Sequence, residues 1–476
     1  FRSLFVGLIA VAAYVIDAEA AAPPPQPNFI LIMADNLGYG DIEPFGSKLH
    51  RTPNLNRMAK EGRKMTSFYS ASGVCTPSRA ALMTGCYPRR VGLDWTPEDG
   101  HVLRPVSPNG LNPDEITLAE ALKKAGYSTA CIGKWHLGDQ PKFMPNRQGF
   151  DYSLGLPYSD DMTRATGQRI GERLRGNQWP PLPWMENGKV IEAPADRNQM
   201  TQRETAAALK FIAANKAQPF FLYLPHNMPG SSRQPFSSKS FSGKSKNGAW
   251  GDAVEELDWA LGQILRALKK HHIDKRTLVL WTSDNGAPRR TPPQGSNGPL
   301  GGWGYTTAEG GMRVPCIVRW PGSIPAGSTC DELSSLMDLL PTFARLAGAK
   351  LPTHKIDGKN IWPLWSQPKA KTPHESFYYY HSQYLEAVRN ERWKLYLPHS
   401  PDQPVRKGTK RRKQPVLYKV KTDIAEKHDV AAQHPKIVER LTQAAQAARR
   451  DLGEGKQKGA NTRPVGKFKK PAPQIK

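Results

Sequence analysis

The sequence predicts an α/β fold: a mostly parallel sheet sandwiched by helices, followed by a small C-terminal antiparallel-sheet subdomain. Residues 28–33 and 277–282 read as strands that are apolar on both faces, which is typical of a parallel sheet covered by helices on each side. Between them, helical patterns alternate with short apolar strands. After Pro363 the pattern changes to short aromatic strands separated by turns, which predicts antiparallel pairing.

The elements of the larger domain follow from start and stop signals along the chain. Thr117 and Glu120 form a capping-box pattern that begins a helix, and Gly126 ends it. Similar patterns at Thr201 and Asp252 begin two further helices. The expected strands are 28–33, 128–132, 219–224, 277–282 and 316–320, and the expected helices are 117–125, 201–215, 252–268 and 334–346.

The C-terminal third predicts a separate small unit. Aromatic strands are expected at 376–381, 387–389, 393–397 and 415–419, and a helix at 435–447. The predicted organisation is a signal peptide over 1–22, a main domain over 27–365, an α+β subdomain over 374–452 and a basic, disordered tail over 453–476.

Residues 1–22 have the pattern of a secretory signal. Arg2 is followed by an apolar run from Leu4 to Ile16 and then by the A-x-A-like site Ala18-Glu-Ala20. The run is short for a membrane span, although an uncleaved anchor stays open as an alternative. We therefore expect an exported protein, periplasmic or extracellular, with no stable membrane insertion after cleavage.

The charge and cysteine content limit the possible partners. The 476 residues carry 67 Lys and Arg against 42 Asp and Glu, a formal charge of +25 that attracts anions such as nucleic acid, acidic membrane or sulfated polymer. The basic residues gather in loops and the tail without a nucleic-acid-binding motif, so no nucleic-acid partner is expected. Five cysteines are too few for a disulfide scaffold, and pairing of Cys316 with Cys330 is left open.

The segment around Cys75 is the strongest chemical signal in the chain. Thr76 is a competent N-cap and Pro77 suits the first helical position, so Cys75 is expected at the N-terminus of a short helix. Backbone N–H groups at that end favour an anion, and Arg79 adds a permanent positive charge. A small apolar thiol beside a surface arginine is the alternative interpretation.

Two pairs of oxygen-bearing residues follow the two buried strands. Asp35-Asn36 ends the first strand and Asp284-Asn285 ends the second. Because ligands of parallel sheets gather at the carboxyl ends of strands, the pairs are expected to face one site. Two carboxylates and two amides suit a hard cation such as Ca²⁺ better than Zn²⁺, although simple turn formation explains either pair alone.

Further polar residues extend this site. Lys134 and His136 occupy alternate positions of an extended segment and are expected to point to one side. An ammonium binds sulfate or phosphate oxygens, and an imidazole transfers protons. Ser159 and Asp161 are candidate substrate contacts, with loop capping as the alternative.

These motifs resemble those of the type I sulfatases of the alkaline phosphatase superfamily. Residues 75–85 resemble the family signature and residues 133–138 its second signature; the likeness extends from Pro27 to about Leu364 and more weakly to about Leu452. The resemblance implies an alkaline phosphatase-like fold, with 27–365 as the catalytic domain. It also implies that a formylglycine-generating enzyme oxidises Cys75 to formylglycine (3-oxoalanine), the nucleophile. Calcium would be held by Asp35, Asn36, Asp284, Asn285 and an oxygen of the modified Cys75.

The resemblance further implies how a sulfate ester would be hydrolysed. Arg79 and Lys134 would stabilise the modified side chain and the sulfate oxygens. His136 is the candidate for assisting release of sulfate, and His226 for protonating the leaving alcohol. Ser159 and Asp161 match a family segment that contacts substrate. A sulfated small molecule or glycan is the expected substrate, with a sulfated carbohydrate as the first candidate.

Three positions depart from the family pattern. Asn36 stands where the family usually has aspartate, Gly230 where many members have a second histidine, and Gly304 where a lysine is usual. These departures leave two alternatives open. One is a phosphodiester or phosphonate monoester hydrolase of the same superfamily. The presence of Asn285 disfavours this alternative, because the hydrolases compared carry histidine at that position. The other is a non-catalytic binder of sulfated glycans on a decayed scaffold.

Overall fold

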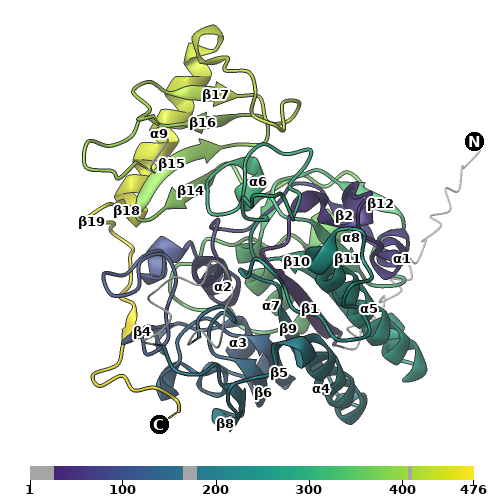
Figure 1. Ribbon diagram of the computed structural model, residues 1–476. Coiled ribbons are helices and arrows are strands. Elements are labelled where there is room, and N and C mark those ends of the chain that lie inside the picture. The colour runs from purple at the N-terminus through teal and green to yellow at the C-terminus, as the bar shows by residue number, and fades with distance from the viewer. Residues whose placement is uncertain (1–25, 164–178, 406–409, 476) are drawn as a thin grey trace, which may run out of the picture.

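A ten-stranded sheet forms the centre of the molecule (Figure 1). The computed structural model describes residues 26–163, 179–405 and 410–475, so the expected signal peptide over 1–22 lies outside the described residues. The strand order is β12-β2-β11-β10-β1-β9-β5-β6-β7-β8. The middle strands are parallel: β10 (Thr277–Ser283), β1 (Asn28–Asp35), β9 (Phe220–Pro229), β5 (Ser128–Lys134) and β6 (Tyr152–Leu156).

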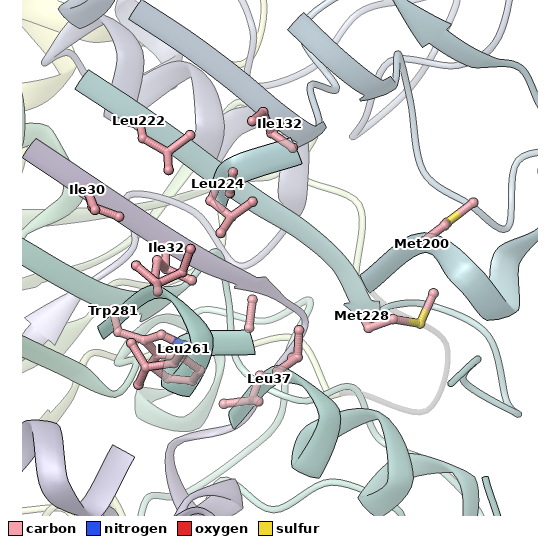
Figure 2. Packing of buried hydrophobic residues seen from close by; sticks show 14 of the residues in the cluster. Ile30, Ile32, Leu37, Ile132, Met200, Leu222, Leu224, Met228, Leu261 and Trp281 are labelled. Carbon is pink, nitrogen blue, oxygen red and sulfur yellow. The ribbon is translucent and has the colours of Figure 1, made fainter. Parts of the chain in front are cut away.

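Helices cover both faces of this sheet. Alternate side chains of β1 point to opposite faces, and because they are apolar, both faces must be covered. Ile30 and Ile32 belong to one apolar layer, and Phe29 and Leu31 to the other. Figure 2 shows the first layer, where Leu222 and Leu224 of β9 and Trp281 of β10 lie beside Ile30 and Ile32. The helices of this layer are α1 (Pro53–Glu61), α4 (Met200–Asn215) and α5 (Gly248–Lys270), and those of the opposite layer are α2 (Cys75–Thr84), α3 (Leu118–Lys124), α7 (Leu339–Ala347) and α8 (Trp362–Ser366).

The predicted cap of α3 is confirmed, whereas that of α5 is wrong. Thr117 Oγ1 accepts from the N–H of Glu120, and the Glu120 carboxylate accepts from the N–H of Thr117. Helix α5 begins at Gly248, four residues before the expected cap at Asp252. The Asp252 carboxylate instead accepts hydrogen bonds from the backbone of residues 243–245, which join the preceding loop to the helix.

Short strands, most of them antiparallel to their neighbours, complete the edges of the sheet. β11 (Cys316–Arg319) pairs antiparallel with β10 and with β2 (Arg63–Met65), and β2 also pairs parallel with β12 (Ser328–Cys330). Cys316 and Cys330 are therefore register partners of Met65 on opposite sides of β2, and both thiols are free. The other edge is β7 (Trp184–Glu186) and β8 (Lys189–Glu192), and the short pair β3 (Phe68–Tyr69) and β13 (Ser334–Ser335) lies outside the main sheet.

The C-terminal subdomain is a four-stranded antiparallel sheet covered by one helix, as the sequence predicted. Figure 1 shows it as a separate lobe, with α6 (Glu309–Met312) between it and the main sheet. Its apolar core is shared with Tyr69, Ala81 and Tyr87 of the larger domain. The elements are β14 (Phe377–His381), β15 (Tyr384–Arg389), β16 (Lys394–Tyr396), β17 (Val416–Tyr418) and α9 (Pro435–Leu452).

The expected disorder of the tail 453–476 is corrected by the structure, which describes it to residue 475. A short hairpin, β18 (Gly453–Glu454) and β19 (Gln457–Lys458), follows α9, and β20 (Gly466–Lys467) pairs with β4 (Asn109–Gly110) of the larger domain. Arg463 donates to both carboxylate oxygens of Glu115. Such specific contacts hold a segment whose composition had predicted disorder. The segment runs past β4 in Figure 1. No helix of the described segments has the length and apolar character to cross a bilayer.

Candidate active site

The two oxygen-bearing pairs lie together at the carboxyl ends of β1 and β10. The parallel register aligns Ala34 with Ser283, so Asp35 and Asp284 leave neighbouring strands at the same level. The Asn36 N–H donates to Asp284 Oδ1 at 2.9 Å, and Asn285 Nδ2 donates to Asn36 Oδ1 at 2.6 Å. All four side chains are fully buried. Residues about 250 positions apart in sequence thus form one polar cluster.

Cys75 joins this cluster from the N-terminus of α2. The helix begins at Cys75, with Val74 as the extended N-cap residue, so Thr76 is not the cap that the sequence suggested. The Thr76 hydroxyl instead donates to the His136 carbonyl at 3.0 Å and fixes the helix start against the loop after β5. Cys75 Sγ lies 3.9 Å from Asn36 Oδ1, and Cys75, Asp35 and Asp284 offer ligand atoms within 4.8 Å of one another.

Arg79 and Lys134 supply the positive charges of the cluster. Arg79 Nη2 lies 2.8 Å from Asp284 Oδ2 and 3.1 Å from Asp35 Oδ1, and Nη1 donates to the Lys134 carbonyl at 2.6 Å. Lys134 Nζ donates to Asp35 Oδ1 at 2.8 Å and to Ser159 Oγ at 3.1 Å. Both cations are fully buried, where electrostatic interactions are strong.

The cluster fits a hard divalent cation. Asp35, Asn36, Asp284 and Asn285 offer carboxylate and amide oxygens, the ligand type that Ca²⁺ takes. Asn285 Oδ1 is buried and has no hydrogen-bond partner among the described residues. An unsatisfied buried acceptor costs free energy, so a cation at this point would complete the cluster.

The cluster also shifts the pKa values of its own acids. Burial and the nearby Asp35 raise the pKa of Asp284 to about 6, although Arg79 and Lys134 oppose this. For Asp35 burial acts in the same direction, but Lys134 and Arg79 outweigh it and lower its pKa. Burial raises the pKa of the Cys75 thiol well above its usual value, and the negative charge of Asp35 acts in the same direction. The unmodified thiol is therefore a poor nucleophile here.

His136 lies beside the cluster as a neutral imidazole. Its Nε2 is 2.9 Å from the Leu103 carbonyl, which only accepts hydrogen bonds, so Nε2 carries the hydrogen. Nδ1 is buried and has no partner among the described residues. Burial lowers the pKa of His136, and the positive charges of Lys134 and Arg79 lower it further. The ring is thus neutral, with a free lone pair on Nδ1.

The structure does not bring His226 to the cavity, contrary to its expected role as the acid for the leaving group. Its Nδ1 lies 2.6 Å from Glu204 Oε2 of α4, and Asn227 Nδ2 donates to Glu204 Oε1 at 2.6 Å. This buried carboxylate turns the ring toward the helix layer, and His226 is absent from the described cavity wall. A lone histidine in sequence does not reveal such a partner.

A cavity of about 1590 Å³ opens onto Cys75. His136, Ser159 and Asp161 line it, so the two expected substrate contacts face the same space as the cysteine. Part of its wall comes from the C-terminal subdomain, through the turn between β14 and β15. The turn residues Ser382 and Gln383 both have positive φ, at 49° and 79°, as in the tight turns that suit two-residue hairpins.

Ser231 and Tyr305 are cavity residues that the sequence reasoning missed. Asn36 Nδ2 donates to Ser231 Oγ at 2.9 Å, and Ser231 Oγ lies 3.3 Å from the Tyr305 hydroxyl. Both follow a departure from the family pattern. A Cβ at Gly230 would lie 3.7 Å from Asp35 Oδ2, and one at Gly304 would lie 2.2 Å from the Gly286 carbonyl, so no side chain fits at Gly304. Tyr305 has a φ of 66°, unusual for tyrosine and not readable from sequence.

Comparison with known proteins decides the family. A family model described as Sulfatase matches residues 27–349, and a second, described as the C-terminal region of aryl-sulfatase, matches residues 372–470. The chain belongs to the sulfatase family. It is 38% identical to the steryl-sulfatase of Mus musculus over 441 residues, which cover 78% of this chain and 70% of that protein. It is 40% identical to arylsulfatase A of Bos taurus over 381 residues, 78% of this chain and 73% of that protein. The protein is thus a sulfuric ester hydrolase of the arylsulfatase type.

Two solved structures share the fold. Ps i-CgsB in complex with k-i-k-neocarrahexaose superposes with a TM-score of 0.72 at 32% identity, covering 89% of this chain and 92% of that one. The PsFucS1 sulfatase from Pseudoalteromonas sp. superposes with a TM-score of 0.77 at 27% identity, covering 89% and 90%. The large sheet flanked by helices and the small C-terminal sheet are therefore the expected sulfatase architecture.

Proposed function

We propose that this sulfatase is exported and hydrolyses a sulfate ester on a carbohydrate, with Cys75 converted to formylglycine by a formylglycine-generating enzyme and with bound calcium. The observation that carries the proposal is the position of Cys75 Sγ, at a helix N-terminus and within 4.8 Å of ligand atoms of Asp35 and Asp284. Asp35, Asn36, Asp284, Asn285 and the modified residue 75 would hold the ion. When present, the aldehyde hydrate supplies the nucleophile and calcium offsets charge on the sulfate oxygens.

The remaining residues have roles that follow from their contacts. Arg79 and Lys134 present buried positive charge toward the same point, where sulfate oxygens would lie. His136 holds its Nδ1 lone pair ready to take a proton during release of sulfate. Ser159, already hydrogen-bonded to Lys134, and Asp161 would contact the substrate from the wall. Glu204 holds His226 Nδ1, His226 Nε2 has no partner among the described residues, and the ring does not line the cavity, so we assign it no step.

Hydrolysis of a phosphodiester or phosphonate is the second candidate. The phosphonate monoester hydrolase of Agrobacterium radiobacter superposes with a TM-score of 0.60 at 19% identity, a likeness that shows the fold alone. Asn285 contributes an amide oxygen to the cluster, where the compared relatives carry histidine. This amide favours sulfate as the substrate.

Two measurements test the proposed chemistry. In protein from a host with the converting enzyme, mass analysis should show the peptide of residue 75 about 18 Da lighter than the thiol form, as exchange of thiol for aldehyde requires. That protein with calcium should hydrolyse 4-nitrophenyl sulfate much faster than bis(4-nitrophenyl) phosphate. The Cys75→Ala variant should show neither the mass change nor hydrolysis of the sulfate ester. A clear preference for the phosphodiester, or unmodified thiol with undiminished binding of sulfated glycan, would defeat the proposal in favour of the hydrolase or the binder.

The proposed export rests on residues 1–22 and has its own test. Expression of the full chain followed by fractionation should recover mature protein outside the cytoplasm, with an N-terminus near Ala20. Recovery of the chain with this segment attached, in the membrane fraction, would indicate an uncleaved anchor instead.

A further inference from the structure

The catalytic cavity carries far more positive charge than one sulfate group requires. Besides Arg79 and Lys134, which are fully buried beside Cys75, further arginine, lysine and histidine side chains line it. The excess positive charge is divided between two walls, one from the catalytic domain and one from the C-terminal subdomain and the segment that follows it.

The catalytic-domain wall holds three arginines in the loops after β9 and β10: Arg233, Arg289 and Arg290. Arg290 Nη2 donates to the Ser231 carbonyl, which places its guanidinium next to the residue that contacts Asn36 of the metal cluster. Arg290 Nε has no hydrogen-bond partner among the described residues. Arg233 and Arg289 are exposed, and none of the three forms an ion pair with a carboxylate of the described chain.

The opposite wall holds Arg412 and Lys456 beside the β14–β15 turn. The Arg412 guanidinium lies 4.9 Å from the centre of the Tyr396 ring, and its Nη2 is buried without a partner among the described residues. Lys456 is exposed in the turn between β18 and β19, and no carboxylate of the described chain pairs with it. The tail that the sequence predicted to be disordered thus contributes a cation to the cavity.

Three carboxylates line the cavity, Asp99, Asp161 and Glu386, and none of them forms an ion pair with these cations among the described residues. Asp99 accepts from the hydroxyls of Thr96 and Ser107, and Glu386 accepts from the hydroxyl of Thr307 and the amide of Gln403. Asp99 and Glu386 are thus held by neutral donors, and of the two only Glu386 lies close enough to a wall cation, Arg412, to act on its charge. Unpaired guanidinium groups around a cleft concentrate anions there and offer two parallel donors to a sulfate or carboxylate.

We propose that Arg289 and Arg290 on one wall, and Arg412 and Lys456 on the other, bind additional anionic groups of the substrate. This inference rests on the proposed function and deepens it. The preferred substrate is then an oligosaccharide that carries sulfate or carboxylate groups on sugar units flanking the sulfate ester that is cleaved. A sulfate ester with no other charge engages neither wall.

Specificity ratios test the proposal. The probes are two oligosaccharides with the same backbone, one bearing only the scissile sulfate and the other a further sulfate on the adjacent unit. The wild type should give the higher kcat/KM with the disulfated probe, and 150 mM added salt should reduce that advantage, since exposed charge interactions are screened. In Arg289→Gln/Arg290→Gln the ratio should fall by about 10-fold to 100-fold, the effect of losing one or two charge-assisted hydrogen bonds. Lys456→Gln tests the second wall and should lower the ratio by about threefold, as for an exposed charge.

Arg266→Gln is the matched control. Arg266 is an exposed arginine of α5 outside the cavity lining, so this variant removes the same charge and should leave the ratio unchanged. Equal loss with both probes in the double arginine variant would overturn the proposal, because it would indicate a general positioning effect of Arg290 on Ser231.

Binding distinguishes failure of this inference from failure of the proposed reaction. Calorimetric titration of the inactive Cys75→Ala protein with the disulfated probe, and with a probe carrying a carboxylate instead of the second sulfate, requires no turnover. Tighter binding of either dianion than of the monosulfated probe supports the inference even if residue 75 is never modified, and the tighter of the two identifies the second group. If single-stranded DNA of equal charge competes as well as the disulfated probe, the walls form an unselective polyanion surface and the proposed substrate class is wrong.

Discussion

The protein holds two buried clusters of charge, one beside Cys75 and one around Glu309 of α6, between the main domain and the C-terminal subdomain. In the first, Asp35 and Asp284 face Arg79 and Lys134. In the second, Glu309 of α6 is surrounded by Lys394 and Arg389 of the C-terminal subdomain and by Arg313. Both use acids and cations removed from water, yet their hydrogen bonding differs.

The interdomain cluster satisfies its acceptors with protein groups. Glu309 Oε1 accepts from Lys394 Nζ at 3.0 Å and from the Tyr379 hydroxyl at 3.0 Å, and Oε2 accepts from the Tyr69 hydroxyl. Lys394 also contacts Glu426 at 2.9 Å. The cluster beside Cys75 instead leaves Asn285 Oδ1 and His136 Nδ1 without partners among the described residues. Saturated polar networks fix a structure, whereas unsatisfied ones mark where a ligand or a proton belongs.

Asp284→Asn should give the largest effect and fall on activity. Loss of this negative charge weakens the proposed metal site and the ion pair with Arg79, so kcat/KM for 4-nitrophenyl sulfate should drop by roughly 10³-fold. The exposed Asp114 provides the control Asp114→Asn, which should retain full activity. If Asp284→Asn keeps activity within tenfold of wild type, the cluster beside Cys75 does not differ in function from the one around Glu309.

Glu309→Gln should instead act on stability. The substitution leaves Arg313, Arg389 and Lys394 buried with one carboxylate fewer, which typically costs about 3–5 kcal/mol of unfolding free energy. Denaturant unfolding measures this loss, and kcat per folded molecule should change little. A variant that unfolds like wild type but has lost activity would assign Glu309 to the active site.

The same carboxylate predicts a pH dependence. Burial alone would raise the pKa of Glu309, but Lys394, Arg389 and Arg313 together lower it to about 2. A depressed folded-state pKa contributes stability that is complete above the unfolded-state pKa, about 4.5, and is lost as pH falls toward 2. The stability difference between wild type and Glu309→Gln should therefore shrink by at most about 3 kcal/mol over that interval. A constant difference from pH 5 to pH 2 would show that folding does not lower the pKa of Glu309.

Calcium should distinguish the clusters by binding only the unsaturated one. At a concentration 100 times Kd, a ligand specific for the folded state adds about 2.7 kcal/mol, so calcium should raise Tm and chelation should reverse the rise. Glu309→Gln should retain the calcium-induced shift from its lower starting Tm, and Asp284→Asn should lose it. An equal shift in both variants would place the ion elsewhere.

What the sequence predicts well here is local or periodic. The strands at 28–33 and 277–282, and the meeting of their polar ends, follow from apolar patterning and the geometry of parallel sheets. The helix start at Cys75 also follows from local signals, to within one or two residues. These features need no knowledge of distant partners.

What it misses depends on tertiary partners. His226 is turned by Glu204, the basic tail is held by pairing with β4, and Tyr305 reaches the cavity through a positive φ. Composition and spacing contain no information on such contacts, because each is decided by a residue far along the chain or by a backbone conformation that few tyrosines adopt.

Asn36→Asp should give the smallest effect on Tm. It discriminates most clearly between a ligand and a structural residue, because the sign of the change in Tm depends on calcium. Without the ion, a third carboxylate beside Asp35 and Asp284 adds repulsion and loses the hydrogen bond from Asn36 Nδ2 to Ser231, so Tm should fall by the equivalent of about 1 kcal/mol. With calcium, the added charge strengthens coordination, so Kd should decrease and the calcium-induced rise in Tm should exceed that of wild type. Asn227→Asp, at another buried amide away from the cavity lining, controls for burying a charge and should lower Tm with or without calcium. If Asn36→Asp behaves like this control, Asn36 is not a ligand, and the cluster beside Cys75 would be structural like the one around Glu309.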